Sequence, residues 1–336
     1  MNDTTAVANN LLEVKNLKVH FPLAASHNSV KAVDGVSFQV KQGKTIGIVG
    51  ESGSGKSTAA MAVMRLLKIT DGEINLDGAA LSTLEGEELR RFRSNFQMIF
   101  QDPFSSLDPR RRVGEIIREP LDRLDIDSEQ DRRARVAELL RRVGLRPEQA
   151  HLFPHQFSGG QRQRICVARA LASRPKLVIC DEPVSALDVA IQAQILNLLS
   201  DLQQEFNLTY MFISHDLGVV QYMCDEVAVM YLGQIAEQAD RIELFDKPLH
   251  PYTIALLSSV PSVDSGEAAK RLRLEGDPPS PINPPSGCRF HERCPFAEAR
   301  CHNEEPQLRV VAGNRSVACH RVSDAGEREY PIDSWN

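Results

Sequence analysis

The residues Gly50-Glu51-Ser52-Gly53-Ser54-Gly55-Lys56-Ser57 match the pattern G-x-x-x-x-G-K-[ST]. They follow a continuous apolar run at 45–49, typical of a strand covered on both faces, and they precede a segment of helical composition at 57–67. Glycines let main-chain N–H groups converge on phosphate oxygens, and a helix N-terminus adds partial positive charge. We expect Lys56 to reach the β- and γ-phosphates and the Ser57 hydroxyl to bind Mg²⁺. The sequence therefore predicts a binding site for a nucleoside triphosphate.

Two acidic residues follow a second apolar run. The predicted strand at 177–180 is followed directly by Asp181 and Glu182. Because ligands bind at the carboxyl ends of parallel strands, both acids are expected to face the same crevice as the glycine-rich loop. We expect Asp181 to hold Mg²⁺, directly or through water, and Glu182 to orient or deprotonate the attacking water. An apolar run that ends in Asp-Glu is a weak signal alone, and the loop at 50–57 favours the functional interpretation.

Strand and helix patterns alternate along the chain. An amphipathic helix is predicted at 190–206, and the segment 102–175 has the composition of a helical lobe inserted beside the sheet. Alternation of strands and helices favours an α/β protein with a largely parallel sheet. Further strands are predicted at 11–14, 36–40, 210–213 and 227–231.

Composition and charge exclude several classes of protein. A chain of 336 residues predicts about two domains, and 42% hydrophobic with 25% charged residues is ordinary for a globular protein. No apolar run approaches the ~20 residues of a membrane helix, and no secretory signal is visible, so a cytosolic protein is expected. The formal charge of −6 argues against a nucleic-acid-coating protein. Arg110–Arg112 and Arg132–Arg133 are interspersed with acids and are interpreted as a solvated helical face.

The run Phe157-Ser158-Gly159-Gly160-Gln161-Arg162-Gln163-Arg164 identifies a family. Its Ser158–Gln161 stretch resembles the signature motif of the ATP-binding subunits of ABC transporters. Other motifs of that family follow in order, and the resemblance covers about Leu11 to Tyr252. They are Phe21 at the place of an adenine-stacking aromatic, Gln101 of the Q-loop, Ser185-Ala186-Leu187-Asp188 of the D-loop and the switch histidine His215.

The resemblance implies an ABC-type P-loop ATPase. Its expected fold has a RecA-like parallel-sheet core, an antiparallel β subdomain and a helical signature subdomain, and two cassettes would enclose two ATP molecules head to tail. Glu182, His215 and Gln101 are the implied catalytic residues, and Ser57, Gln101 and Asp181 the implied Mg²⁺ ligands. The implied nucleotide-binding residues are Phe21, Gly50, Ser52, Gly53, Ser54, Gly55, Lys56, Ser57, Thr58, Gln101, Ser158, Gly159, Gly160, Gln161, Asp181, Glu182 and His215.

The C-terminal part resembles one subfamily. His250-Pro251-Tyr252-Thr253, a Pro-rich stretch and four cysteines are similar to the C-terminal region of oligopeptide and dipeptide importer ATPases. The segments 100–103 and 107–110 resemble the second of that system's two paired ATPases. This implies peptide uptake at the cytoplasmic face of a bacterial inner membrane, with a second ATPase, two permease subunits and a periplasmic binding protein. Related importers carry nickel or glutathione, so those substrates stay open.

A non-transport ABC ATPase acting on DNA or the ribosome is the rival hypothesis. About a hundred residues separate Lys56 from Ser158, which leaves no room for a long coiled coil, and no second glycine-rich loop is present. Both observations disfavour the rival.

The seven cysteines form two groups. Cys166, Cys180 and Cys224 are scattered and are expected to be buried hydrophobes. The other four suit an iron–sulfur cluster or a tetrahedral zinc site, although the C-x₂₋₄-C spacing common at zinc is absent. The resemblance implies a [4Fe–4S] cluster, with zinc and free thiols as alternatives. These four are Cys288, Cys294, Cys301 and Cys319, and His291, His302 and His320 lie nearby in sequence.

The predicted organisation has three parts. An ABC ATPase domain spans 11–260, with its helical subdomain at about 102–175. A Pro-rich connector spans 261–287, because so many prolines cannot continue a helix or a central strand. A small Cys-rich module is predicted at 288–336.

Overall fold

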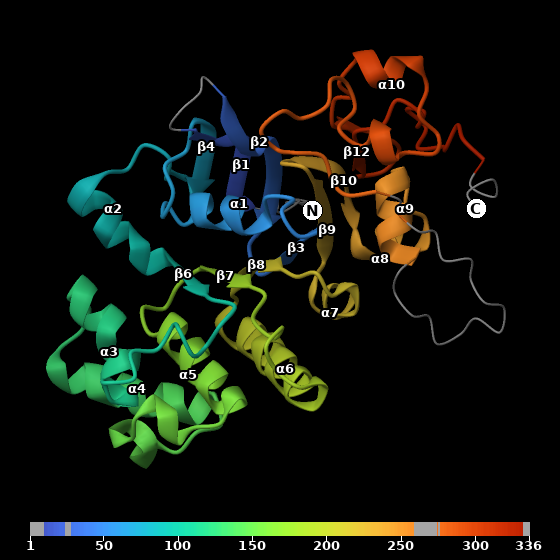
Figure 1. The fold of residues 1–336 in the computed structure, drawn as a ribbon. Coiled ribbons are helices and arrows are strands. Elements are labelled where there is room, and N and C mark those ends of the chain that lie inside the picture. The colour runs from blue at the N-terminus through green and yellow to red at the C-terminus, as the bar shows by residue number, and fades with distance from the viewer. Residues whose placement is uncertain (1–9, 24–27, 259–273, 275, 332–336) are drawn as a thin grey trace, which may run out of the picture. The chain divides into compact units, whose positions relative to one another are not determined.

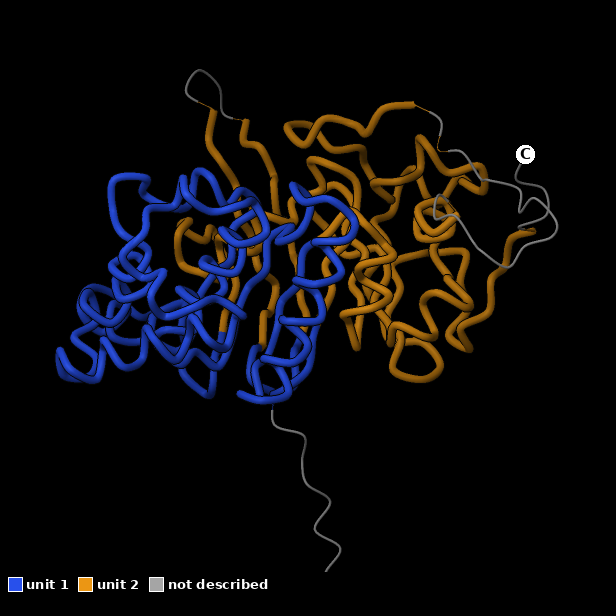
Figure 2. Tube along the Cα trace, turned by 90° about the horizontal axis from the view of Figure 1, so that it is seen from below, with its two compact units in different colours: residues 1–12, 39–45, 75–213 blue, residues 13–38, 46–74, 214–336 orange. Residues whose placement is uncertain are grey.

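The computed structural model describes residues 10–23, 28–258, 274 and 276–331. The chain folds into two compact units, coloured separately in Figure 2. Unit 1 comprises 1–12, 39–45 and 75–213, and unit 2 comprises 13–38, 46–74 and 214–336.

Unit 2 contains a sheet in which β3 pairs with β9 in parallel, from Ile46 opposite Glu226 to Val49 opposite Val229. All five residues of β3 are buried, as its continuous apolar run predicts. Beyond β9 the pairing becomes antiparallel. The strands follow one another in the order β11 (Arg309–Val310), β12 (Ser316–Val317), β10 (Gln234–Asp240), β9 (Glu226–Tyr231) and β3 (Thr45–Val49).

Three long strands of a second sheet run mainly through unit 2, in the order β2 (Ser29–Lys41), β1 (Asn10–Pro22) and β4 (Asp71–Leu76). Buried and more exposed positions alternate along much of β1 and β2, as expected for half-buried strands. The strands predicted at 11–14 and 36–40 are parts of β1 and β2. The helices of unit 2 are α1 (Lys56–Val63), α7 (Leu217–Met223), α8 (Arg241–Asp246), α9 (Pro251–Ser258), η4 (His291–Arg293) and α10 (Ala299–Asn303).

Helix α1 is shorter than the predicted segment 57–67. Arg65 adopts a left-handed backbone with φ of 51°, which a continuing right-handed helix does not tolerate. The helix therefore ends at Val63.

Unit 1 contains three parallel strands in the order β8 (Thr209–Ile213), β7 (Leu177–Asp181) and β6 (Phe96–Ile99). Leu177 lies opposite both Phe96 and Thr209. The predicted helical segment 102–175 contains α3, α4 and α5, which pack against one another (Figure 1). The remaining elements are β5 (Ala79–Ala80), α2 (Gly86–Phe92), η1 (Arg93–Asn95), α3 (Val113–Leu124), α4 (Glu129–Arg142), η2 (Pro147–His151), η3 (Pro154–Gln156), α5 (Gly159–Leu171) and α6 (Val189–Phe206).

The arginine clusters of the helical segment form ion pairs with neighbouring acids. Arg132 lies 3.2 Å from Asp122 and 2.7 Å from Asp125, and Arg133 lies 3.0 Å from Glu129. For Arg132–Arg133, which lie on α4, the interpretation as a helical face of mixed charge is confirmed. For Arg110–Arg112 the helical part is wrong, because these residues lie in a turn before α3.

The C-terminal part of unit 2 has its own apolar core. Phe296 and Tyr330 stack there with ring centroids 4.5 Å apart. Cys294 packs against the core. Its buried members are Leu249, Ile254, Ala255, Phe296, Val311, Val317, Cys319, Val322 and Tyr330.

A buried carboxylate joins this core to strand β10. Glu237 is fully buried and accepts hydrogen bonds from the main-chain N–H groups of Leu249 and His250, each at 2.8 Å. The guanidinium of Arg315 lies 2.9 Å from the same carboxylate. Burial raises the pKa of Glu237 even though these donors favour its charged form.

The predicted connector and its boundary are only partly described. No helix or strand occurs from 276 to 287, as the prolines predict. The predicted boundary at 260/261 and the connector residues 261–273 lie outside the described residues. No helix in the described ranges combines the length and the apolar character needed to cross a bilayer.

We predict that acid destabilises the protein through His250. Burial lowers the pKa of His250 from 6.5 to about 4, and its Nδ1 accepts the N–H of Tyr252 at 3.0 Å. The folded state keeps the ring neutral, so His250 contributes fully to the free energy of unfolding above pH 6.5. This contribution, up to about 3 kcal/mol, is lost as the pH falls toward 4.

Urea unfolding of the wild type and of His250→Asn, which retains an acceptor for the Tyr252 N–H, measures this effect. Between pH 6.5 and 4.5 the free energy of unfolding of the wild type should fall relative to that of His250→Asn. A constant difference would contradict a buried neutral imidazole.

Candidate functional site

The loop 50–57 connects β3 to α1 and has a backbone that two glycines permit. Gly55 is the N-cap of α1 with φ of 103°, and a Cβ atom there would lie 2.1 Å from the Ala32 carbonyl oxygen. Gly50 has φ of 150°, and its Cβ would lie 2.1 Å from the Met230 carbonyl oxygen. Only glycine fits both positions. These two glycines let the main chain of the loop fold tightly at the N-terminus of α1, which is a place where anions bind.

Lys56 places its charge inside this loop. Its side chain is buried, and its Nζ donates to the carbonyl oxygens of Gly50 and Glu51, each at 2.8 Å. Ser57 and Thr58 occupy the next positions of α1. A cation over a glycine-rich main chain is an arrangement that can bind the phosphates of a nucleotide.

Two other predicted residues of unit 2 are exposed. Phe21 lies near the end of β1 with 39% of its surface exposed. His215 is also exposed and precedes α7, whose N-terminus is capped by Asp216. Asp216 accepts the N–H of Gly218 at 2.8 Å.

Unit 1 holds the two predicted acidic site residues at the end of β7. Asp181 is the last residue of β7, opposite Ile213 of β8, and Glu182 follows with a left-handed φ of 47°. The Glu182 N–H donates to the Ile213 carbonyl oxygen at 3.0 Å. Gln101 Nε2 donates to Glu182 Oε2 at 2.8 Å, so the structure brings together two residues that sequence places 81 positions apart. A strained backbone held by such contacts is typical of functional sites.

The signature residues 158–161 begin α5. Ser158 is the N-cap: its hydroxyl accepts the Gln161 N–H at 3.4 Å, and the Gln161 side chain accepts the Ser158 N–H at 3.1 Å. This reciprocal pair is a capping box. Asp188 caps α6 with its side chain alone and accepts the Ile191 N–H at 3.0 Å. Local capping thus fixes the start of both helices.

We predict that Gly160→Ala destabilises unit 1. A Cβ at Gly160 would lie 2.5 Å from Cγ2 of Ile191, a branch atom that cannot rotate freely. The expected cost is about 2 kcal/mol of unfolding free energy. The matched control is Gly159→Ala, whose Cβ would make an ordinary contact of 3.6 Å with Leu187. Thermal unfolding without nucleotide measures both, and an equal melting temperature for the two variants would contradict the prediction.

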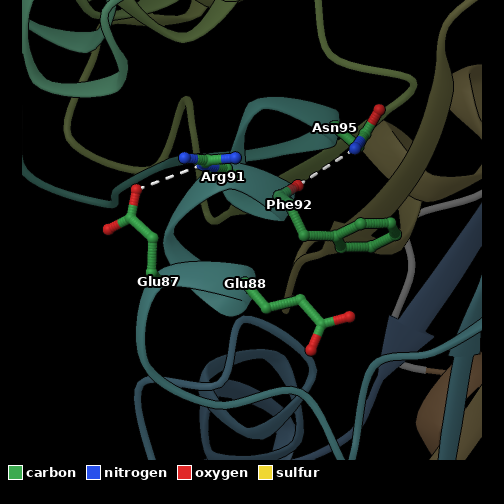
Figure 3. Close-up of a pocket in the computed structure, with 5 residues that line it drawn as sticks. All are labelled: Glu87, Glu88, Arg91, Phe92 and Asn95. Atoms are coloured by element: carbon green, nitrogen blue, oxygen red, sulfur yellow. Dashed lines mark hydrogen bonds and ion pairs between the residues drawn. The ribbon is translucent and has the colours of Figure 1, made fainter.

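A shallow surface pocket of about 510 Å³ lies elsewhere in unit 1 (Figure 3). It is formed by α2 and η1, and Arg91 donates to Glu87 at 3.2 Å across its edge. It contains none of the predicted nucleotide-binding residues. The lining residues are Glu87, Glu88, Arg91, Phe92 and Asn95.

The arrangement of the four C-terminal cysteines in the structure does not support the predicted metal cluster. Within the described part of the chain, no three or more His, Cys, Asp or Glu residues form a group that could hold a metal ion. Burial raises the pKa of Cys288 to about 11 and the pKa values of Cys294 and Cys319 to about 12. Such thiols pack as neutral groups, and Cys319 belongs to the apolar core described above. Cys166, Cys180 and Cys224 are buried, as predicted.

Two residues near the loop have no counterpart among the predicted site residues. Arg293 and Tyr252 both contact Glu51, the second residue of the loop. Tyr252 belongs to a stretch that the sequence singles out only by resemblance, and no sequence pattern links Arg293 to a residue 242 positions earlier.

Comparison with known proteins identifies the family. Residues 33–185 match the ABC transporter family, and residues 236–301 match the family described as Oligopeptide/dipeptide transporter, C-terminal region. The chain is 52% identical to the oligopeptide transport ATP-binding protein AppF of Bacillus subtilis (strain 168), over 95% of this chain and 100% of that protein. It is 46% identical to the di/tripeptide transport ATP-binding protein DppF of Pseudomonas aeruginosa (strain UCBPP-PA14), over 93% and 98%.

A solved structure supports the same assignment. A dimeric, post-hydrolysis state of the ATP-binding cassette MJ0796 with ADP and phosphate superposes with a TM-score of 0.62. The two sequences are 30% identical, and the match covers 68% of this chain and 98% of that one. With the loop, the capped signature helix and these relatives in agreement, the chain belongs to the family of ATP-binding subunits of oligopeptide and dipeptide ABC transporters.

Proposed function

We propose that this protein hydrolyses ATP to power the uptake of di- or oligopeptides by an ABC importer. The observation that carries the proposal is the loop 50–57, in which Lys56 lies over a main chain shaped by Gly50 and Gly55. This is a phosphate cradle, and the family to which the chain belongs couples such a cradle to peptide transport.

Each predicted residue has a role in binding ATP. Main-chain N–H groups of 52–58 would hold the phosphates, with Lys56 at the β- and γ-phosphates and Phe21 stacked on adenine. Ser57, Gln101 and Asp181 offer hydroxyl, amide and carboxylate oxygens, a donor set that suits Mg²⁺. The ion would supply charge neutralisation at the phosphates.

Glu182 would orient or deprotonate the attacking water, because a carboxylate that accepts a hydrogen bond from Gln101 is held in one place. His215 would contact the γ-phosphate. Ser158, Gly159, Gly160 and Gln161 would bind the ATP held by an opposing cassette, and loss of the γ-phosphate would then open the dimer.

The partners in this proposal are a second ATPase subunit, two membrane permease subunits and a periplasmic binding protein, with this chain at the cytoplasmic face of the inner membrane. The names of the curated relatives favour peptides as cargo. Nickel and glutathione are the alternative cargoes.

Purification in mild detergent, followed by identification of the bound chains, tests this assembly. We expect two multi-spanning membrane proteins and a second ATPase. Recovery of ribosomal proteins or DNA without any membrane protein would contradict the transport function.

The iron–sulfur cluster is a prediction that rests on the sequence. Four thiols match the ligand type of a [4Fe–4S] cluster, but the described geometry does not gather them into a metal site. Anaerobic purification with iron, sulfide and zinc analysis decides between a cluster, zinc and free thiols. If a cluster is present, Cys288→Ser should lose it, and Cys166→Ser, which changes a buried cysteine of unit 1, should keep it.

A further inference from the structure

The C-terminal part of unit 2 contacts the second residue of the phosphate-binding loop at two points. The main-chain N–H of Glu51 donates to the Tyr252 hydroxyl at 2.9 Å. The Glu51 carboxylate pairs with the Arg293 guanidinium through both oxygens, at 2.7 and 3.0 Å. Tyr252 comes from α9 and Arg293 from η4, so two separate elements fix one loop residue.

The Arg293 and Tyr252 side of these contacts is shielded from water, while the Glu51 side chain is 27% exposed. The Arg293 side chain is 6% exposed and Tyr252 is fully buried, whereas an ordinary surface ion pair is open to solvent on both sides. A two-point pair between a guanidinium and a carboxylate fixes direction as well as distance. The Tyr231 ring lies 5.8 Å from the same guanidinium and adds a cation–π contact.

The segment that carries Arg293 is itself anchored. Phe290 is buried against Tyr231 and Tyr252, with ring centroids 5.3 and 5.5 Å away. Arg289 donates to the Leu232 carbonyl oxygen and pairs with Asp34.

The Arg289 pair has an electrostatic effect on Asp34. Burial alone would raise the pKa of Asp34, but the charge and hydrogen bonds of Arg289, with His20, hold it below its ordinary value. The segment that carries Arg293 is thus anchored by the buried Phe290 ring and by the Arg289–Asp34 ion pair. This anchoring fixes the position from which Arg293 contacts Glu51.

Glu51 transmits this support to the phosphate-binding lysine. Its carbonyl oxygen accepts a hydrogen bond from Lys56 Nζ at 2.8 Å, while its N–H is held by Tyr252 and its carboxylate by Arg293. One residue therefore connects the C-terminal elements to the group expected to bind the β- and γ-phosphates.

We propose that Arg293 and Tyr252 are positioning residues that clamp Glu51 and thereby set the affinity of the loop for ATP. The proposal rests on the proposed function, because it assumes that this loop binds ATP. The clamp gives the family's C-terminal region a role in nucleotide binding: it holds the loop in its binding shape before ATP arrives, which lowers the cost of binding.

The test measures kcat and KM for ATP together with the dissociation constant of a fluorescent ATP analogue, N-methylanthraniloyl-ATP, on the full chain. Arg293→Ala and Tyr252→Phe should each weaken binding and raise KM, by about tenfold for Arg293→Ala, with kcat changed by less than about twofold. Arg293→Lys keeps the charge but loses the two-point geometry and should fall between Arg293→Ala and the wild type.

Two variants in the same region serve as controls. Arg300→Ala removes an exposed ion pair with Glu304, and Tyr330→Phe removes a buried hydroxyl that donates to the Leu249 carbonyl oxygen, away from the loop. Both should bind the analogue with wild-type affinity.

Wild-type KM in Arg293→Lys and Tyr252→Phe would overturn the clamp, even if Arg293→Ala fails to fold. An equal loss of affinity in the controls would also overturn it, because that result indicates general destabilisation. A wild-type protein that neither binds nor hydrolyses ATP would contradict the proposed function, and this proposal with it.

Discussion

Glu182→Gln should lower the rate of ATP hydrolysis by about 10³-fold and leave ATP binding intact. The amide retains an oxygen that can accept the hydrogen bond from Gln101 Nε2, which is 2.8 Å long in the wild type, so the geometry at the end of β7 is kept. What the variant loses is the ability to take a proton from water. Hydrolysis should stop after ATP has bound, and the cassette dimer should accumulate in the closed, ATP-bound state.

Phosphate release and size-exclusion chromatography with Mg-ATP measure both consequences. Glu148→Gln, an equivalent change at an exposed position in η2, is the control and should hydrolyse ATP like the wild type. Unchanged hydrolysis in Glu182→Gln would show that another group acts as the base.

Lys56→Ala should weaken ATP binding by about 100-fold or more. The Lys56 ammonium is buried, donates to two loop carbonyls and is the cation of the proposed phosphate cradle. Its removal takes away the proposed charge-assisted hydrogen bonds to phosphate, and each such bond is worth about 1.5–3 kcal/mol of binding free energy.

Calorimetric titration with Mg-ATP measures the loss, and circular dichroism checks that the variant is folded. Lys68→Ala removes an exposed lysine beyond α1 and should bind ATP normally. Wild-type affinity in Lys56→Ala would place the nucleotide somewhere other than the loop 50–57.

Local sequence patterns predicted much of the fold. The strands predicted at 45–49 and 177–180 are continuous runs without charged residues, and the structure buries all of their residues. The amphipathic helix predicted at 190–206 spans Val189–Phe206 and ends at Asn207, whose left-handed φ of 52° stops it. Hydrophobic runs and hydrophobic periodicity are visible within a few residues, so such strands and helices can be identified without knowing which elements pack against them.

Contacts between distant residues could not be predicted in the same way. The Arg293–Glu51 pair joins residues 242 positions apart, and the Arg315–Glu237 pair joins residues 78 apart. Neither has a local signature, because a charged residue that will be buried has the same appearance in sequence as one that stays in water.

The candidate site was predicted unevenly for the same reason. The loop 50–57 and the cap at Ser158 are local motifs, and the sequence locates both. The Gln101–Glu182 hydrogen bond depends on the parallel pairing of β6 with β7, and the sequence analysis predicts no strand at 96–99 and selects Gln101 only through family resemblance. The metal cluster at the four cysteines followed from residue type and family resemblance, and neither of these fixes where buried sulfur atoms lie.

The most direct test of the account is peptide uptake by proteoliposomes that contain the purified complex, its binding protein and enclosed ATP. We expect radiolabelled di- or oligopeptide to accumulate with the wild-type subunit and not with the Glu182→Gln subunit. Equal accumulation with both subunits, or ATP-driven accumulation of nickel or glutathione but of no peptide, would contradict the claim that ATP hydrolysis by this chain powers peptide import.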